Sequence, residues 1–150
     1  MEKIISHIAQ TDDRITPLIL RITLAMVLWP HGAQLLLGIY GGYGYTASMA
    51  YLTADGLPYI VAFTVIFLQF FGSLFVLLGL YTRLFTAGLL FMFIGMIVTT
   101  HWSVGFFMNW NGTLKGEGFE YHLLAIGICL SIILSGSGRL SLDRHFYKNQ

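Results

Sequence analysis

Polar side chains that can exchange a proton or hold a cofactor occur inside the apolar parts of this 150-residue chain. The set contains three histidines, one glutamate and two glutamines: His31, Gln34, Gln69, His101, Glu120 and His122. An ionisable side chain within a bilayer is costly, so each one indicates either a functional site or a specific structural contact. A neutral imidazole relays protons near pH 7, and a carboxylate can act as an acid or a base. Such groups are able to hydrogen-bond and protonate a quinone carbonyl.

The same side chains could instead bind a metal ion or haem, because imidazole and carboxylate groups are common ligands in metal sites. A dedicated metal site needs a strict ligand spacing, and the chain contains neither His-Glu-x-x-His nor Cys-x-x-Cys-His. Its single cysteine, Cys129, lies within an apolar run. A metal site is therefore only weakly indicated, no residue is predicted as a metal ligand, and these residues leave a quinone or similar apolar cofactor, haem and a metal ion open.

Within this set we expect His31, His101 and Glu120 to be the catalytic residues, as proton or hydrogen-bond partners of the cofactor. His31 and Gln34 lie three positions apart and share a helix face, so they can present an imidazole and an amide together. The expected cofactor-binding residues are His31, Gln34, Gln69, His101 and His122. Each has a structural alternative, either a hydrogen bond between helices or a position at headgroup level.

The spacing in the last apolar segment predicts which of its side chains face inward. Glu120, Gly127 and Ser131 lie within about 20° of one another at 3.6 residues per turn, and small residues favour close helix packing in lipid. This row predicts that Glu120 points into the protein. His122 lies two positions further on, so we expect it to face away. The structural alternative for Glu120 is a carboxylate in the first turn, which the helix dipole favours.

Four apolar segments must position these residues, and each is close to the roughly 20 residues that a helix needs to cross the hydrocarbon core. They run from about residue 16 to 38, 58 to 80, 83 to 102 and 119 to 136. Backbone groups in lipid must be satisfied within each segment, so we predict helices. The fold class is therefore an all-α membrane protein, a bundle of four transmembrane helices that forms a single domain over residues 1–150.

Composition excludes other classes of protein. Hydrophobic residues make up 56% of the chain and charged residues only 10%, against about 25% charged residues in an ordinary soluble domain. A net charge of +1 provides no basic field for nucleic acid. We therefore expect the lipid bilayer as a partner and no nucleic acid.

Lysine and arginine residues in short loops set the orientation, because they stay on the cytoplasmic side. At or beyond the ends of the segments, one side has only Lys115. The other side has Lys3, Arg14, Arg83, Arg139, Arg144 and Lys148. Both termini are thus predicted to be cytoplasmic, and the histidines of the spans and Glu120 to lie near the periplasmic face.

Three shorter features are predicted between the segments. Gly79 is typical of a helix C-cap and Thr82 of an N-cap, so the second and third segments should be antiparallel neighbours. We expect a short interfacial helix near residues 46–53. The loop after the third segment carries aromatic residues typical of the headgroup belt, namely Trp102, Phe106, Phe107 and Trp110.

Arg21 lies about one and a half turns inside the first segment, so its long side chain can reach the polar boundary. Alternatively, Asp143 folds back from the C-terminal stretch to pair with it. We expect a structural role for both residues, because the cytoplasmic half of the spans contains no other ionisable group.

Several short motifs, taken in order, resemble the DoxX family of small bacterial membrane proteins, and the resemblance covers about residues 21–143. The matching pieces are Arg21 followed by His31-Gly32, Gly79-Leu80-Tyr81-Thr82-Arg83, His101 before Gly105-Phe106, Gly118-Phe119-Glu120-Tyr121 and Gly138-Arg139-Leu140-Ser141-Leu142-Asp143. Two positions depart from the pattern, since relatives often have a lysine near Leu35 and a glutamate near Gln69. Any proton or substrate role of those charges is therefore in doubt for this chain.

The resemblance implies a redox association in the bacterial inner membrane. Relatives include subunits of an archaeal terminal quinol oxidase complex that also oxidises thiosulfate with quinone as acceptor. We therefore expect a redox-associated subunit that binds a quinone near the periplasmic face, together with a protein partner of a redox complex or a second copy of the chain in a homo-oligomer. The alternative is a non-catalytic membrane anchor or assembly partner of a redox or metal-handling complex. Transport is least favoured, because alternating access usually needs broken helices in paired repeats.

Overall fold

The computed structural model describes residues 14–148, and that range contains helices and no strand. Lys3 and the other residues before 14 lie outside the described part. The elements are α2 (Thr16–Leu37), α3 (Gly44–Ala54), α4 (Tyr59–Phe67), η1 (Leu68–Gly72), α5 (Ser73–Leu78), α6 (Thr82–Met96), η2 (Ile97–His101), α7 (Glu120–Ser135) and α8 (Leu142–Lys148). The elements η1 and η2 are π-helical turns within longer continuous helices. The helix expected near residues 46–53 is confirmed as α3.

Three continuous helices are long and apolar enough to cross a membrane, namely Thr16–Leu37, Tyr59–Leu78 and Thr82–His101. Each has at least 20 residues, or about 30 Å at 1.5 Å per residue, which matches the hydrocarbon core. The chain is thus a membrane protein, and three of the predicted spans are confirmed as helices of the required length. Since α7 is apolar but has only 16 residues, the fourth span stays a prediction, as does the orientation of the termini.

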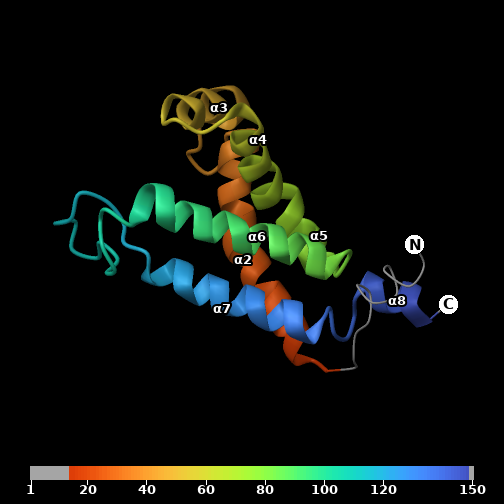
Figure 1. Ribbon diagram of the computed structural model, residues 1–150. Coiled ribbons are helices and arrows are strands. Elements are labelled where there is room, and N and C mark those ends of the chain that lie inside the picture. The colour runs from red at the N-terminus through yellow and green to blue at the C-terminus, as the bar shows by residue number, and fades with distance from the viewer. Residues whose placement is uncertain (1–13, 149–150) are drawn as a thin grey trace.

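The three long apolar helices and α7 form two pairs of helices that cross each other (Figure 1). In one pair, α2 packs along the helix formed by α4, η1 and α5, and in the other α6 packs along α7. The α3 end of the first pair and the α6–α7 loop of the second point in different directions (Figure 1). The pairs therefore separate toward these ends and converge toward the end near α8.

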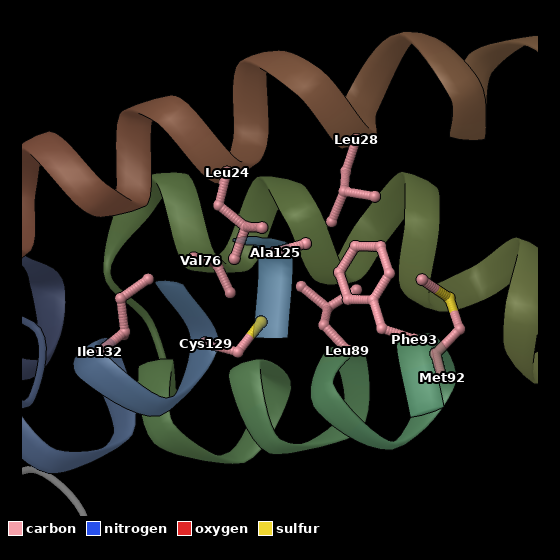
Figure 2. Packing of buried hydrophobic residues seen from close by; sticks show 9 residues of the cluster. All are labelled: Leu24, Leu28, Val76, Leu89, Met92, Phe93, Ala125, Cys129 and Ile132. Atoms are coloured by element: carbon pink, nitrogen blue, oxygen red, sulfur yellow. The ribbon is translucent and has the colours of Figure 1, made fainter. Parts of the chain in front are cut away.

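An apolar core fills the crossing between the two pairs. Leu24 and Leu28 of α2 point toward Val76 of α5 and toward side chains from α6 and α7 (Figure 2). The buried cluster consists of Leu24, Leu28, Val76, Leu89, Met92, Phe93, Ala125, Cys129 and Ile132. Lipid tails are as apolar as these side chains, so close van der Waals packing contributes most to this association.

The backbones of α2 and η1 approach each other closely. A Cβ atom at Gly32 would lie 2.5 Å from the backbone carbon of Gln69 and 2.5 Å from the backbone nitrogen of Phe70. The rings of Trp29 and Phe70 then pack with centroids 5.8 Å apart. Only glycine at position 32 permits this contact, which places the π-turn of the second span directly against the first.

The C-terminal stretch fixes the turn between α5 and α6. Gly79 ends α5 with a φ of 68°, which confirms the predicted C-cap. The predicted N-cap at Thr82 is wrong, because the cap position is Tyr81 and the capping side chain is Asp143. The two carboxylate oxygens of Asp143 accept hydrogen bonds from the backbone N–H groups of Tyr81 at 2.7 Å and Thr82 at 2.9 Å. A negative charge is favourable at a helix N-terminus, so Asp143 from the C-terminal stretch acts as the cap of α6.

Candidate functional site

Two histidines from neighbouring helices meet where α6–η2 and α7 join their connecting loop. His101 is the last residue of η2, and His122 lies in the first turn of α7. Their ring centroids are 4.2 Å apart, with an angle of 41° between the ring planes. Phe93 and Tyr121 contact the His122 ring edge-to-face, with centroids 5.9 and 5.7 Å away. We call His101 and His122 the imidazole pair.

His122 is the buried member of the imidazole pair. Only 5% of its surface is exposed, and its Nδ1 atom has no hydrogen-bond partner among the described residues. A buried polar atom left without a partner costs about 1–3 kcal/mol, so folded proteins contain few of them. An unpartnered, buried ring nitrogen of this kind is suited to a ligand that forms hydrogen bonds.

His101 is held by the loop that precedes α7. Its Nδ1 atom lies 2.7 Å from the backbone carbonyl oxygen of Glu117. Since a carbonyl oxygen only accepts hydrogen bonds, Nδ1 carries the proton and donates it to this contact. In the neutral ring, Nε2 then has a free lone pair that can take up a proton. The imidazole pair thus combines one ring of fixed tautomer with one ring whose Nδ1 is unpartnered.

The carboxylates of Glu120 and Glu117 bind the backbone of the loop between η2 and α7. Oε1 of Glu120 accepts a hydrogen bond from the backbone N–H of Met108 at 3.0 Å, and Oε2 of Glu117 accepts one from Asn109 at 2.8 Å. The backbone N–H of Glu120 in turn donates to the carbonyl of Phe106 at 2.9 Å. Glu120 was expected to point into the protein as an acid or base, but its carboxylate binds the loop backbone instead.

The predicted facing of α7 is wrong. Its buried residues are His122, Ala125, Cys129 and Ile132. Gly127 and Ser131 are exposed, and a Cβ atom added at Gly127 would meet nothing within 4 Å. The larger side chains of the buried row fill the space against α2 and α6, whereas the small residues leave a surface open. The spacing of three, four and three residues in the buried row was the sequence signal that identifies His122 as inward-facing.

His31 and Gln34 lie away from the imidazole pair. His31 is exposed on α2, and Nε2 of Gln34 donates to the carbonyl oxygen of Tyr40 at 3.0 Å, which holds the loop after α2. The end of α2 and the start of α7 lie well apart in Figure 1. The structure therefore separates the polar residues that the sequence analysis had grouped in one outer site.

Gln69 lies in the contact between η1 and α2 and is 6% exposed. It is buried together with Ala62, Gly72 and Ser73, and Oγ of Ser73 donates to the backbone carbonyl of Gln69 at 2.6 Å. This position is typical of a residue in a helix–helix contact, which was its structural alternative.

Arg21 and Asp143 form a polar centre at the opposite end of the spans. Arg21 is 1% exposed and donates to the carbonyl oxygens of Val76 at 2.8 Å and of Leu77 and Ser137 at 2.6 Å. Val76 and Leu77 belong to the last turn of α5, where a positive charge is favourable. The guanidinium group and the Asp143 carboxylate attract each other, but each makes its hydrogen bonds to backbone groups. The expected fold-back of Asp143 therefore occurs, with backbone contacts in place of a direct ion pair.

The imidazole pair provides fewer donor groups than a protein metal site uses. Within residues 14–148 no group of three or more histidine, cysteine or carboxylate side chains is arranged to hold a metal. The imidazole pair provides two nitrogen ligands, whereas protein zinc sites use three or four protein ligands. Two imidazoles at the end of apolar helices are able to hold and protonate the carbonyl oxygen of an apolar ring.

Comparison with known proteins gives a family and one relative. Residues 16–102, from α2 to just beyond η2, match the sequence profile of the DoxX family. Over 135 residues, which are 89% of this chain and 88% of the relative, the sequence is 29% identical to the "Putative oxidoreductase CatD" of Bacillus subtilis (strain 168). No solved structure matches the chain significantly.

Proposed function

The chain belongs to the DoxX family, and from this premise we propose that it is a redox-associated protein of the bacterial inner membrane that binds a quinone near the periplasmic face. In this proposal it is a subunit of a quinone-linked oxidoreductase. The oxidoreductase name of the Bacillus subtilis relative supports a redox role. The observation that carries the proposal is the buried Nδ1 atom of His122, which lacks a partner beside His101.

The imidazole pair supplies the two functions that a quinone site needs. A bound quinone would contribute the two-electron, two-proton redox chemistry. His122 would hold a carbonyl oxygen through Nδ1–H, in a setting where Phe93 and Tyr121 exclude water from the ring. His101 would exchange protons through Nε2, because the Glu117 carbonyl already binds its Nδ1–H.

The other predicted site residues support this arrangement from a distance. Glu120 holds the loop between η2 and α7 through the backbone N–H of Met108. Gln34 holds the loop after α2 through Tyr40, and Gln69 contributes to the α2–η1 contact. His31, exposed on α2, has no place in the proposed quinone site.

The proposal treats α7 as a fourth transmembrane helix and places both termini in the cytoplasm. In support, α7 packs along α6 and is apolar. Arg83, Arg139 and Arg144 gather where α5 and α6 connect and where the chain leaves α7, whereas Lys115 belongs to the loop at the other end. This distribution agrees with cytoplasmic placement of the arginine-rich end.

Quinone binding by the purified protein in lipid nanodiscs tests the proposal. The probe is 2,3-dimethoxy-5-methyl-1,4-benzoquinone, which is a quinone ring without a tail. We expect saturable binding by the wild type and at least about tenfold weaker binding by His122→Phe, because one lost hydrogen bond to a desolvated partner is worth roughly 1.4 kcal/mol. Phenylalanine keeps an aromatic ring in the same space, so the packing against Phe93 is preserved.

The matched control is His145→Phe, which changes an exposed histidine on α8. Circular dichroism and thermal unfolding establish that both variants are folded. Equal affinity of folded His122→Phe and the wild type, or no saturable binding by the wild type, would contradict the proposal.

A non-catalytic role as an anchor or assembly partner is the second candidate, and the α6–α7 loop favours it. Trp102, Phe107 and Trp110 are 69%, 70% and 85% exposed, so they present aromatic surface to headgroups or to a protein partner. This role predicts that Trp110→Ala reduces co-purification of a partner subunit while quinone binding is absent from the wild type.

A further inference from the structure

Positive charge gathers at the end of the helices near α8. Arg83 lies in the first turn of α6, Arg139 follows α7, and Arg144 lies in α8. Among the described residues at this end, Asp143 is the only carboxylate, and its charge acts on the start of α6 and on Arg21. The other three arginines, which we call the arginine cluster, therefore leave this end with an excess of positive charge.

Hydrogen bonds bring Arg83 and Arg144 to the same region of the protein. Nε of Arg83 donates to the carbonyl oxygen of Ile133 at 3.0 Å, in the last turn of α7, where carbonyl groups lack partners within the helix. Arg144 directly follows Asp143, whose carboxylate accepts the N–H of Thr82 at 2.9 Å. Since Thr82 directly precedes Arg83, the cap of α6 holds the two arginines near each other.

A compact turn joins Arg139 to Arg144. Oγ of Ser141 donates to the carbonyl oxygen of Gly138 at 2.9 Å and accepts the backbone N–H of Arg144 at 3.3 Å. The backbone N–H of Arg139 donates to the carbonyl oxygen of Arg14 at 3.0 Å, which fixes the turn to the start of α2. The arginine cluster therefore belongs to one backbone framework of fixed geometry.

Apolar surface adjoins the arginine cluster. Leu84 and Leu134 lie within one residue of the Arg83–Ile133 hydrogen bond, and they are 60% and 80% exposed. The helices that begin or end here are long and apolar enough to cross a membrane, so this end lies at the level of the lipid headgroups. A free phosphate ion needs only positive charge, whereas a phospholipid also needs apolar surface for its acyl chains. The neighbouring leucines therefore favour a lipid.

We propose that the arginine cluster binds the phosphate group of an anionic phospholipid whose acyl chains lie along α6 and α7. Basic groups between membrane helices at headgroup level attract anionic lipids. A guanidinium group has five N–H donors in a planar fork, so one that holds a carbonyl oxygen can also bind a phosphate oxygen. This inference is independent of quinone binding and of which end faces the cytoplasm, because phosphate groups line both faces of a bilayer.

Native mass spectrometry of the whole protein, released from detergent micelles, tests the inference. The two probes are phosphatidylglycerol and phosphatidylcholine with identical acyl chains, so that only the headgroup differs. We expect the wild type to bind phosphatidylglycerol at least about tenfold more tightly than phosphatidylcholine. Arg139→Gln or Arg144→Gln should weaken phosphatidylglycerol about fivefold and leave phosphatidylcholine unchanged, since one basic residue near an anionic headgroup has about this effect.

The matched control is Lys115→Gln, which removes one positive charge from an exposed position in the loop before α7. It should change neither affinity. Arg139→Lys retains the charge and should retain most of the preference for phosphatidylglycerol. Circular dichroism establishes that each variant is folded.

Competition with inorganic phosphate separates a lipid from a free anion. At constant ionic strength, phosphate should displace no more phosphatidylglycerol than chloride does. Displacement by phosphate alone would identify a site for a free phosphate ion and overturn the assignment to a lipid.

The wild type itself provides a second measurement that needs no variant. Raising the concentration of ammonium acetate should weaken binding of phosphatidylglycerol but not of phosphatidylcholine, because salt screens the attraction between charges. Equal affinities of the wild type for the two lipids, a preference that salt does not reduce, or equal effects of Arg139→Gln and Lys115→Gln would each contradict the inference.

Discussion

His101 and His122 are adjacent rings with different chemical environments. His101 is in contact with the loop and donates to a backbone carbonyl, whereas His122 is enclosed by aromatic rings and has an unpartnered nitrogen. A polar atom in such a place raises the free energy of the folded state unless a ligand satisfies it. This contrast between the two rings is the reason for placing a ligand at this pair rather than at exposed His31.

A single carboxylate at the other end of the spans should contribute measurably to stability. Asp143→Ala removes the acceptor for the backbone N–H groups of Tyr81 and Thr82 at the start of α6, and a negative charge close to Arg21. We predict a loss of about 2 kcal/mol in the free energy of unfolding, measured by chemical denaturation in detergent, as for the loss of a helix cap.

The control for Asp143→Ala is Asp55→Ala, which changes an exposed aspartate after α3. Exposed substitutions of this kind usually alter stability by less than about 0.5 kcal/mol. Equal stability of the two variants would show that Asp143 does not serve as a cap.

At the scale of whole helices, the contact of α2 with η1 depends on one glycine. Gly32→Ala would place a methyl group 2.5 Å from backbone atoms of Gln69 and Phe70, and backbone cannot move aside as a side chain can. We predict a loss of at least about 2 kcal/mol in the free energy of unfolding, because overpacking in a close contact has this magnitude.

Gly95→Ala provides the matched comparison for Gly32→Ala. It introduces the same methyl group into a helix, where nothing lies within 4 Å, and alanine is the better helix former by about 1 kcal/mol. This variant should be as stable as the wild type or more stable. If both alanine variants unfold at the same denaturant concentration, α2 and η1 do not approach as closely as described.

The boundaries of the helices could be predicted from apolar length alone. The segments expected at 16–38, 58–80 and 83–102 appear as Thr16–Leu37, Tyr59–Leu78 and Thr82–His101. The facing of side chains could not be predicted in the same way. The π-turns η1 and η2 shift the register of residues along their helices, so a constant period of 3.6 residues per turn does not hold through them.

The sequence identified the polar residues of the site, but it did not show which of them lie close together in the fold. His31 and His101 both belong to predicted outer halves of spans, yet the two helix pairs diverge there (Figure 1). His122 was expected to face away because the small residues Gly127 and Ser131 were taken to mark the packed face of the helix. Crossing angles and loop contacts, such as that of Glu117 with His101, arise only in the folded chain.

Over the whole molecule, the two ends of the helices differ in the contacts that their side chains make. At one end, Arg21 and Asp143 bind helix termini and hold the helices together. At the other end, the helix pairs separate (Figure 1), and the imidazole pair lies between η2 and α7.

Cysteine labelling in intact cells tests the proposed orientation of the molecule. A membrane-impermeant maleimide added from the periplasmic side should label Lys115→Cys and should not label Arg139→Cys, since both positions are exposed but one precedes α7 and the other follows it. The native Cys129 is buried and should contribute no background. Labelling of Arg139→Cys from outside would place the C-terminal stretch in the periplasm and reverse the proposed orientation.

Infrared difference spectroscopy of a bound quinone tests most directly whether the imidazole pair holds its ring. A hydrogen bond from His122 should lower the stretching frequency of one quinone carbonyl relative to the same quinone in empty nanodiscs. We predict that this lowering is present in the wild type, persists in His145→Phe and is lost in His122→Phe. A carbonyl frequency in the wild type equal to that in empty nanodiscs, or an unchanged lowering in His122→Phe, would contradict quinone binding at this pair.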